Sequence, residues 1–163
     1  MSDSHRTVVL LDDEPPMIEA LQSRFRGRGW SVRAYTDVQS FSKVELLGTE
    51  PAVYVIDHDL GSNSVGYDIV RELRKVRPDG LSLPIVYLTG RESEKSYLEH
   101  RLNQPNLRPS CFINKNRLAH LDLLEVCEGL LEHFHFTLEQ EQSQSLRRAV
   151  ANVARSVPEE DSF

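Results

Sequence analysis

Acidic, hydroxyl and ammonium side chains follow four of the short apolar runs in this sequence, each within three residues of the end of its run. They are Asp12 and Asp13 after the first run, Asp57 and Asp59 after the third, Thr89 after the fourth, and Lys115 after the fifth. Carboxylates that meet at one edge repel, because two charges about 4 Å apart interact with about 4 kcal/mol at an effective dielectric of roughly 20. Such a cluster must bind a cation, hold a proton or splay apart. Hard oxygen ligands with open positions suit Mg²⁺, which also bridges to phosphate groups.

The same residue types can together carry out phosphoryl transfer. An aspartate carboxylate is a nucleophile that forms aspartyl phosphate. A lysine and a threonine hydroxyl can bind the phosphoryl oxygens while a metal ion offsets their charge. Taken singly, an Asp after a strand is usually a cap or turn residue, Lys115 a solvated lysine and Thr89 a packing residue. The whole set, with each group after its own strand, favours a phosphoryl-acceptor site.

Five short apolar runs alternate with amphipathic stretches and would position these groups. The predicted strands cover residues 7–11, 31–35, 52–56, 84–88 and 111–113, and the predicted helices cover 15–27, 37–47, 66–76, 92–102 and 117–135. Four of the runs are continuously apolar, which is typical of strands buried on both faces, whereas 31–35 alternates and is predicted to be an edge strand. This alternation predicts a doubly wound α/β fold with a mostly parallel sheet, which binds ligands at the carboxyl ends of its strands.

Each of the first three helices carries an apolar stripe that is expected to face the sheet. The stripes are Met17, Ile18, Leu21 and Phe25 in the first helix, Val38, Phe41, Val44 and Leu47 in the second, and Ile69, Val70, Leu73 and Val76 in the third. Asp37 is a candidate cap of the second helix and Asn116 of the last.

Composition favours one globular domain of about 120–130 residues with an extension. The chain has 163 residues and a formal net charge of −6, which does not favour a nucleic-acid binder. Its apolar runs are too short to span a bilayer. The two cysteines, Cys111 and Cys127, have no metal-type spacing, and such sparse cysteine usage fits a cytoplasmic setting.

Five stretches resemble the receiver domain of bacterial response regulators. They cover residues 8–15, 53–60, 66–74, 84–90 and 112–115, in the family's order and with similar spacing. The resemblance extends over about 7–134 and implies a flavodoxin-like, five-stranded parallel sheet of order 2-1-3-4-5 with flanking helices. Residues 1–6 and 158–163 would then be tails, and 135–157 a helical extension.

The resemblance also implies a role for each acidic group. Asp57 would accept a phosphoryl group from a phosphohistidine on a histidine kinase or phosphotransfer protein. Asp13 and Asp57 would ligate Mg²⁺, Asp12 would act through water, and the backbone carbonyl of Asp59 would be a further ligand. Lys115 would pair with Asp57 and then with the phosphoryl group. The protein would be a phosphoacceptor that catalyses its own phosphorylation and dephosphorylation, rather than an enzyme.

Four further residues complete the implied site. Thr89 would move toward the phosphoryl group, and rotation of Phe112 would accompany that movement. Asp59 and Arg91 flank the site and would modulate the rate, either as an ion pair that gates water or as two solvated side chains. His58 lies between the acids, but strand alternation points it away from the Asp57 side chain, so a packing or surface role is favoured over metal binding.

The sequence departs from the family at several positions. Asn116 follows Lys115 where the family has a proline joined by a cis bond. Because a cis bond before a non-proline residue costs about 2.5–4 kcal/mol, the Lys115–Asn116 bond is predicted to be trans, or else strained. Gly61 stands where proline is common, and residues 103–110 replace a short turn, which would remodel the surface used for output.

Several alternatives remain open from the sequence. The extension 135–157 is expected to be a signalling helix that dimerises or leads to an output module, or else to fold back on the domain. A phosphatase of the haloacid dehalogenase type also has an Asp-x-Asp motif, which Asp57 and Asp59 match, with Thr89 and Lys115 in order. That class expects its acidic metal motif after the lysine, whereas here the acidic pair comes first. A receiver that only docks partners, without phosphorylation, is the third reading.

Overall fold

The protein is a single parallel sheet with helices on both faces. The computed structural model describes residues 6–60, 66–78, 83–90, 110–115, 122–132, 147–148 and 150–151. Its labelled elements are β1 (Thr7–Leu11), α1 (Pro15–Gly27), β2 (Ser31–Tyr35), α2 (Val38–Glu45), β3 (Val53–Asp57), α3 (Gly66–Val76), β4 (Ile85–Thr89) and β5 (Ser110–Asn114). A further helix covers residues 123–132.

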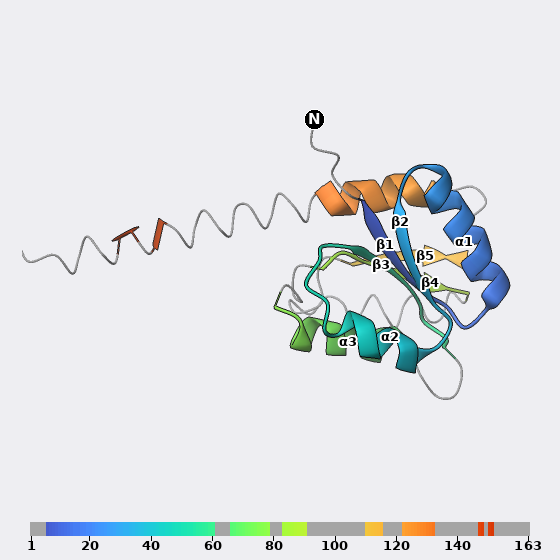
Figure 1. Ribbon diagram of the computed structural model, residues 1–163, viewed down its shortest axis with the longest axis horizontal. Coiled ribbons are helices and arrows are strands. Elements are labelled where there is room, and N and C mark those ends of the chain that lie inside the picture. The colour runs from blue at the N-terminus through green and yellow to red at the C-terminus, as the bar shows by residue number, and fades with distance from the viewer. Residues whose placement is uncertain are drawn as a thin grey trace, which may run out of the picture.

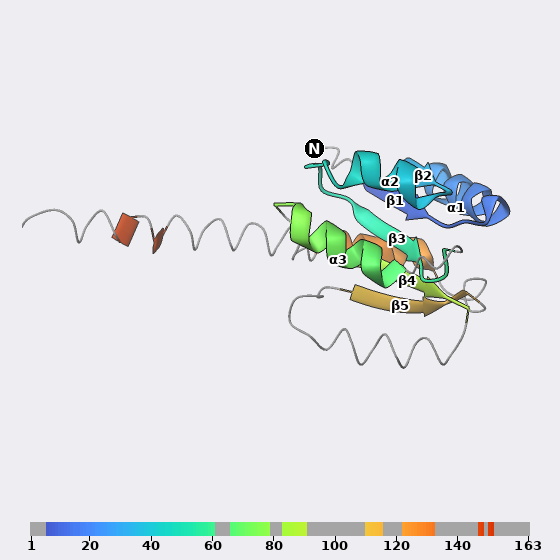
Figure 2. The same cartoon turned by 90° about the horizontal axis from the view of Figure 1, so that it is seen from below.

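The five strands are parallel and follow the order β2-β1-β3-β4-β5, which confirms the predicted fold class and the edge position of β2. α1 and the helix 123–132, drawn in orange, cover one face of the sheet, while α2 and α3 cover the other (Figure 1). The view from below shows α2 on the β1 and β2 side of the sheet and α3 by β3 (Figure 2). The central strands β1 and β3 are buried almost throughout, as their continuous apolar runs predict.

Two strands lie one residue later than predicted. β3 covers Val53–Asp57 and β4 covers Ile85–Thr89, so Asp57 and Thr89 are the last residues of their strands instead of the first residues after them. Asp57 still pairs with Leu88 of β4. The apolar pattern ends at a polar residue, but backbone pairing continues for one more position because hydrogen bonding does not depend on the side chain.

α1 begins and ends as its sequence predicts. Prolines occupy its first positions, where the missing N–H has no intrahelical partner in any case. Ile18, Leu21 and Phe25 are buried on its inner stripe. Gly29, at φ 83°, ends the helix in the left-handed conformation, and its N–H donates to the carbonyl of Arg26. Trp30 then packs edge-to-face on Phe25 at the start of β2.

The apolar stripes predicted for α2 and α3 are partly wrong. α2 is capped by Asp37 as predicted, and its carboxylate accepts a hydrogen bond of 2.8 Å from the N–H of Ser40. However, Val44 and Leu47 are 51% and 80% exposed, and Val76 at the end of α3 is also exposed. α2 ends at Glu45 and turns Phe41 and Glu45 toward the sheet, since residues four apart share a helix face.

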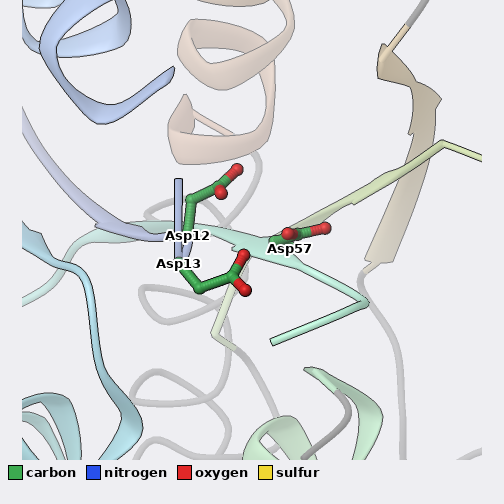
Figure 3. Close-up of side chains that lie close together, drawn as sticks. All are labelled: Asp12, Asp13 and Asp57. Atoms are coloured by element: carbon green, nitrogen blue, oxygen red, sulfur yellow. The ribbon is translucent and has the colours of Figure 1, made fainter. Parts of the chain in front are cut away.

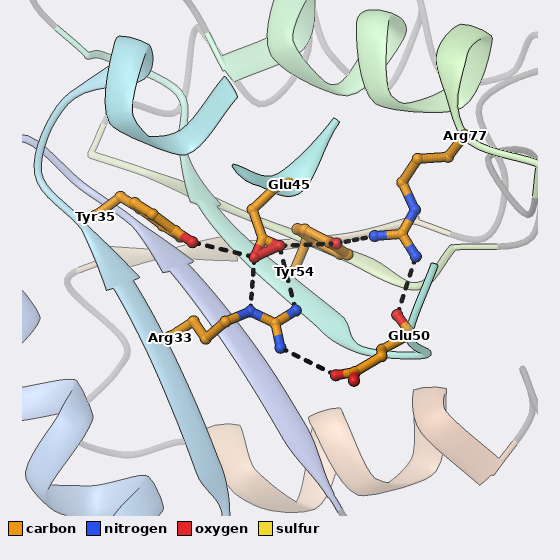
Figure 4. Close-up of polar contacts among 6 residues, drawn as sticks. All are labelled: Arg33, Tyr35, Glu45, Glu50, Tyr54 and Arg77. Atoms are coloured by element: carbon orange, nitrogen blue, oxygen red, sulfur yellow. Dashed lines mark hydrogen bonds and ion pairs between the residues drawn. The ribbon is translucent and has the colours of Figure 1, made fainter. Parts of the chain in front are cut away.

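Glu45 is buried within a polar network that joins α2 to the sheet (Figure 4). The network comprises Arg33, Tyr35, Glu45, Glu50, Tyr54 and Arg77. Arg33 of β2 donates to both carboxylate oxygens of Glu45, at 2.7 and 3.2 Å. The hydroxyl of Tyr54 donates to Glu45 at 3.3 Å and accepts from Arg77 at the end of α3. Since Glu45 and Arg77 both have partners, their burial does not leave an uncompensated charge.

The helix 123–132 begins after Asp122, whereas the sequence predicts one helix over 117–135, of which residues 117–121 lie outside the described residues. Asp122 precedes it and accepts a hydrogen bond from the N–H of Glu125, so Asp122 is the cap in the structure. The proposed cap Asn116 lies outside the described residues. The helix packs through Leu123, Leu124, Cys127 and Leu131, which are buried in the core, and exposed ion pairs join Arg6 to Glu128 and Arg28 to Asp122 at its edge. Of the extension, residues 147–148 and 150–151 are described and helical, so its boundaries and its role stay predictions.

Candidate functional site

Three aspartates meet at the carboxyl ends of β1 and β3. Leu11 at the end of β1 pairs with Ile56 of β3, so the next residues along the two strands, Asp12 and Asp57, lie at the same sheet edge. One carboxylate oxygen from each of Asp12, Asp13 and Asp57 lies within 4.8 Å of the others. Figure 3 shows the three side chains gathered in one place. Asp12 and Asp57 are buried and Asp13 is exposed, so the cluster is open to solvent on one side.

Lys115 completes the cluster from the end of β5. Its Nζ lies 3.1 Å from Asp57 Oδ2 and 3.2 Å from Asp12 Oδ2. Strand pairing places it there, because Thr89 at the end of β4 pairs with Asn114, the residue before Lys115. The Nζ is also 3.9 Å from the carboxylate of Glu14, a contact that sequence reasoning missed. Glu14 belongs to the same acidic run as Asp12 and Asp13, but its contact with the end of β5 depends on tertiary structure, which the run alone does not predict.

Backbone amides fix the remaining oxygens of the two buried aspartates. Asp12 Oδ1 accepts a hydrogen bond of 2.9 Å from the N–H of Glu14. Asp57 Oδ1 accepts one of 3.3 Å from the N–H of Asp59. Each carboxylate therefore has one oxygen held by the chain and one directed at Lys115. This arrangement presents two acidic groups and one ammonium in a fixed geometry.

The electrostatics of the cluster favour an added positive charge. Burial, and then the nearby charge of Asp12, raises the pKa of the Asp57 carboxyl from 3.8 to about 7, although Lys115 acts to lower it. Burial acts to lower the pKa of the Lys115 ammonium, but the carboxylates of Asp57 and Asp12 outweigh burial and raise it. One ammonium is therefore insufficient to keep Asp57 readily ionised beside Asp12.

The donor set fits a hard divalent cation. It consists of carboxylate oxygens, and Oδ2 of Asp12 is buried without a hydrogen bond partner, although it faces the Lys115 ammonium. Mg²⁺ binds through one or two carboxylates and keeps several waters, which the exposed side at Asp13 would accommodate. The cluster therefore can hold a metal ion through Asp12, Asp13 and Asp57.

Gly66, the first residue of α3, packs directly against the backbone of Asp57. A Cβ atom at this position would lie 2.4 Å from the carbonyl oxygen of Asp57 and 3.0 Å from Ile56. The N–H of Gly66 donates a 2.8 Å hydrogen bond to the carbonyl of His58. α3 therefore begins against the strand that carries Asp57, and only glycine permits this approach. Gly66 lies within the stretch 66–74, but neither its spacing nor its neighbours indicate this contact with β3.

The other predicted site residues are placed in part. Thr89 is the last residue of β4, and Phe112 of β5 pairs with Tyr87, but the side chains of both lie outside the described residues. Arg91 and the Lys115–Asn116 bond lie outside them too, as do Gly61 and residues 103–109, so those predictions stay as stated. Asp59 is exposed at the edge of the site, and His58 is buried, as a packing residue would be.

Solved structures resemble this chain, although no protein-family model and no curated protein matches its sequence. The response regulator receiver protein from Sinorhizobium medicae WSM419 is 20% identical, with a TM-score of 0.64 over 82% of this chain and 99% of that chain. The signal receiver domain of an HD domain-containing protein from Pseudomonas fluorescens Pf-5 is 16% identical, with a TM-score of 0.67 over 85% and 96%. A structure described as an adenylate cyclase from Rhodopirellula baltica is 15% identical, with a TM-score of 0.69 over 86% and 98%.

This chain therefore has the fold of response-regulator receiver domains, as the resemblance in sequence predicts. Structural matches at such low sequence identity establish the fold alone, so the activity has to be argued from the residues of the site. Among the described residues, no helix combines the length and the apolar character needed to cross a membrane.

Proposed function

We propose that this protein is the receiver of a two-component system and accepts a phosphoryl group on Asp57. The observation that carries the proposal is the position of the Asp57 carboxylate, 3.1 Å from the Lys115 ammonium and grouped with Asp12 and Asp13. An aspartate in this setting is a nucleophile with a cationic partner for the phosphoryl oxygens. The receiver-domain fold gives the proposal its context.

In the proposed reaction, an Asp57 oxygen attacks the phosphorus of a phosphohistidine. The new O–P bond forms as the N–P bond of the donor breaks, and the histidine nitrogen keeps the electron pair. Asp57 must be ionised for this attack, and its raised pKa means that added positive charge is needed at neutral pH. A bound Mg²⁺ would supply that charge and offset the charge on the phosphoryl oxygens. Asp12, Asp13 and Asp57 would hold it, with the Asp59 carbonyl as a further ligand.

The Lys115 ammonium can pair first with the Asp57 carboxylate and then with the transferred phosphoryl group. It is already within 3.2 Å of two carboxylates, and it would move from Asp57 Oδ2 to a phosphoryl oxygen as the negative charge shifts outward. Thr89 and Phe112 would change position in response to the charge of the bound phosphoryl group. Thr89 ends β4 beside Asn114, next to Lys115 in the chain, which supports its part in this proposed switch.

The partners follow from the same proposal. A histidine kinase or a phosphotransfer protein in the cytoplasm would donate the phosphoryl group, and the extension would contact an output partner or a second copy of the chain. The protein would catalyse its own phosphorylation and dephosphorylation once per cycle. It would not turn over free phosphoesters, which distinguishes it from the phosphatase alternative.

The test is covalent labelling by acetyl phosphate in the presence of Mg²⁺, followed by intact-protein mass spectrometry. The wild type is expected to gain one phosphoryl group per chain, and Asp57→Ala none. Asp68→Asn, which changes an exposed aspartate on α3, is the matched control and is expected to label like the wild type. Labelling of Asp57→Ala, or continued turnover of acetyl phosphate without a labelled chain, would contradict the proposal.

A further inference from the structure

Glu14 is the solvent-facing member of the carboxylates that reach Lys115. Its Oε2 lies 3.9 Å from the ammonium, and its side chain is 63% exposed, whereas Asp12 and Asp57 are almost fully buried. Among the described residues, Lys115 thus has an outer acidic partner at the mouth of the site and two inner ones. A phosphoryl donor that approaches Asp57 from solvent passes two exposed charges, Asp13 within the cluster and Glu14 beside Lys115.

The backbone of Glu14 is fixed, while its side chain is not used to cap α1. Its N–H donates to Asp12 Oδ1, and its carbonyl accepts from the N–H of Ile18 in the first helical turn. Pro15 follows it and restricts it to an extended conformation, at φ −96° and ψ 103°. Glu14 occupies the cap position of α1, but its carboxylate makes no capping hydrogen bond. The carboxylate is directed toward Lys115 instead, from a rigid base.

We propose that Glu14 is a specificity-determining residue that selects phosphoryl donors by their charge. Its carboxylate shares Lys115 with Asp57 and repels highly anionic donors, so it slows labelling by small acyl phosphates more than labelling by less charged donors. The inference rests on the proposed function, because it concerns the same transfer to Asp57. A residue of this kind limits phosphorylation by free metabolites and leaves transfer from a docked protein donor less affected, since docking supplies its own binding energy.

Two small donors deliver the same phosphoryl group with different charge. With acetyl phosphate, a dianion at neutral pH, the Asp57 oxygen bonds to phosphorus as the P–O bond breaks, and acetate leaves with the electron pair. With phosphoramidate, a monoanion whose nitrogen already carries the needed proton, the P–N bond breaks and ammonia leaves. The product on Asp57 is identical, so a difference between the donors isolates the charge of the incoming molecule.

The experiment compares initial labelling rates of the wild type and Glu14→Gln with both donors at saturating Mg²⁺. Coulomb interaction across the mouth of the site leads us to expect an acceleration of about threefold with acetyl phosphate and less than about twofold with phosphoramidate. The difference is expected to vanish near about 1 M salt, where the screening length falls to about 3 Å. Measuring both donors and both salt concentrations separates a charge effect from a general change of structure.

Three variants serve as controls. Glu14→Asp keeps the charge and is expected to label at the wild-type rates. Glu14→Ser removes the charge but is a good cap residue, so it should behave like Glu14→Gln even if that variant loosens α1. Glu19→Gln removes an exposed charge further along α1 and is expected to change neither donor's rate.

The outcomes distinguish the inference from the proposed function. An equal acceleration for both donors that persists at high salt overturns the role of Glu14, as does an unchanged rate in Glu14→Gln and Glu14→Ser. Failure of both donors to label the wild type overturns the proposed function instead. A donor-dependent, salt-sensitive acceleration supports both.

Discussion

The buried carboxyl of Asp57 has a consequence for stability that can be measured without any phosphoryl donor. Its pKa is about 7 in the folded protein and 3.8 as an unperturbed group, so the folded state binds this proton more tightly than the unfolded state. The contribution of the bound Asp57 proton to the free energy of unfolding is complete below about pH 4 and is lost as the pH rises through about 7. Without a divalent cation, the site therefore favours a protonated Asp57 and opposes an ionised one.

Asp57→Asn removes this pH dependence. One pKa unit corresponds to about 1.4 kcal/mol. Between about pH 5 and pH 8, the free energy of unfolding of the wild type should therefore fall by about 2 kcal/mol relative to that of the variant. Urea unfolding at both pH values in the presence of a chelator measures it, with Asp68→Asn as the control. A difference between variant and wild type that is the same at both pH values would show that Asp57 is ionised throughout.

Gly66 offers a second test at the scale of one residue. A methyl group there would meet the Asp57 carbonyl at 2.4 Å, so Gly66→Ala must push α3 away from β3. We expect a loss of about 1–3 kcal/mol in the free energy of unfolding, the usual cost of overpacking. Gly27→Ala is the matched control, because a Cβ at Gly27 meets nothing within 4 Å. Equal unfolding midpoints for the two variants would contradict the close contact between Gly66 and Asp57.

The site residues differ in how far the sequence alone predicts them. Asp12, Asp13, Asp57 and Lys115 follow apolar runs, so strand order alone indicates that they converge. Gly66 and Glu14 act through contacts with backbone and with a distant strand, and periodicity carries no information on such contacts. The sequence therefore predicts the chemical groups well and their immediate supports poorly.

At the scale of elements, the seating of α2 depends on a buried charge that hydrophobic periodicity cannot reveal. A stripe of Phe41, Val44 and Leu47 fits a helix, yet the structure buries Phe41 and Glu45 and exposes the other two. Glu45 can be buried because Arg33 holds it by two hydrogen bonds from the neighbouring strand. Counting apolar residues misses such a pair, whereas α1, which buries apolar side chains, was predicted correctly.

Removing Glu45 should therefore unseat α2. Glu45→Ala leaves the partly buried guanidinium of Arg33 and the buried hydroxyl of Tyr54 without their carboxylate, and we expect a loss of about 2–3 kcal/mol in the free energy of unfolding. Glu50→Ala is the control, because Glu50 is 79% exposed and pairs with the same arginine at 3.5 Å, a contact worth less than about 1 kcal/mol. Denaturant unfolding compares the two, and losses of similar size would mean that the network does not hold α2.

At the scale of the whole molecule, strand order explains why the site lies where it does. β1 and β3 are neighbours in the sheet. The chain passes from β1 to β2 on one side and from β3 to β4 on the other, so the loops after β1 and β3 lead in opposite directions. A crevice opens at such a reversal beyond the carboxyl ends of the strands. Asp12, Asp13 and Asp57 lie there, and the order of β4 and β5 brings Lys115 to the same edge. The same fold occurs in structures described as receivers and as an adenylate cyclase, so this arrangement of side chains, more than the fold, carries the functional argument.

We propose that Asp57 and a divalent cation together form a phosphoryl-binding site. Beryllofluoride mimics a phosphoryl group on an aspartate, and fluorine-19 NMR detects its bound form directly. We expect a bound signal from the wild type with Mg²⁺, and we expect that signal to be lost on chelation, in Asp57→Asn and in Asp13→Asn. A bound signal that persists without Mg²⁺ or without the Asp57 carboxylate, or no bound signal from the wild type, would contradict it.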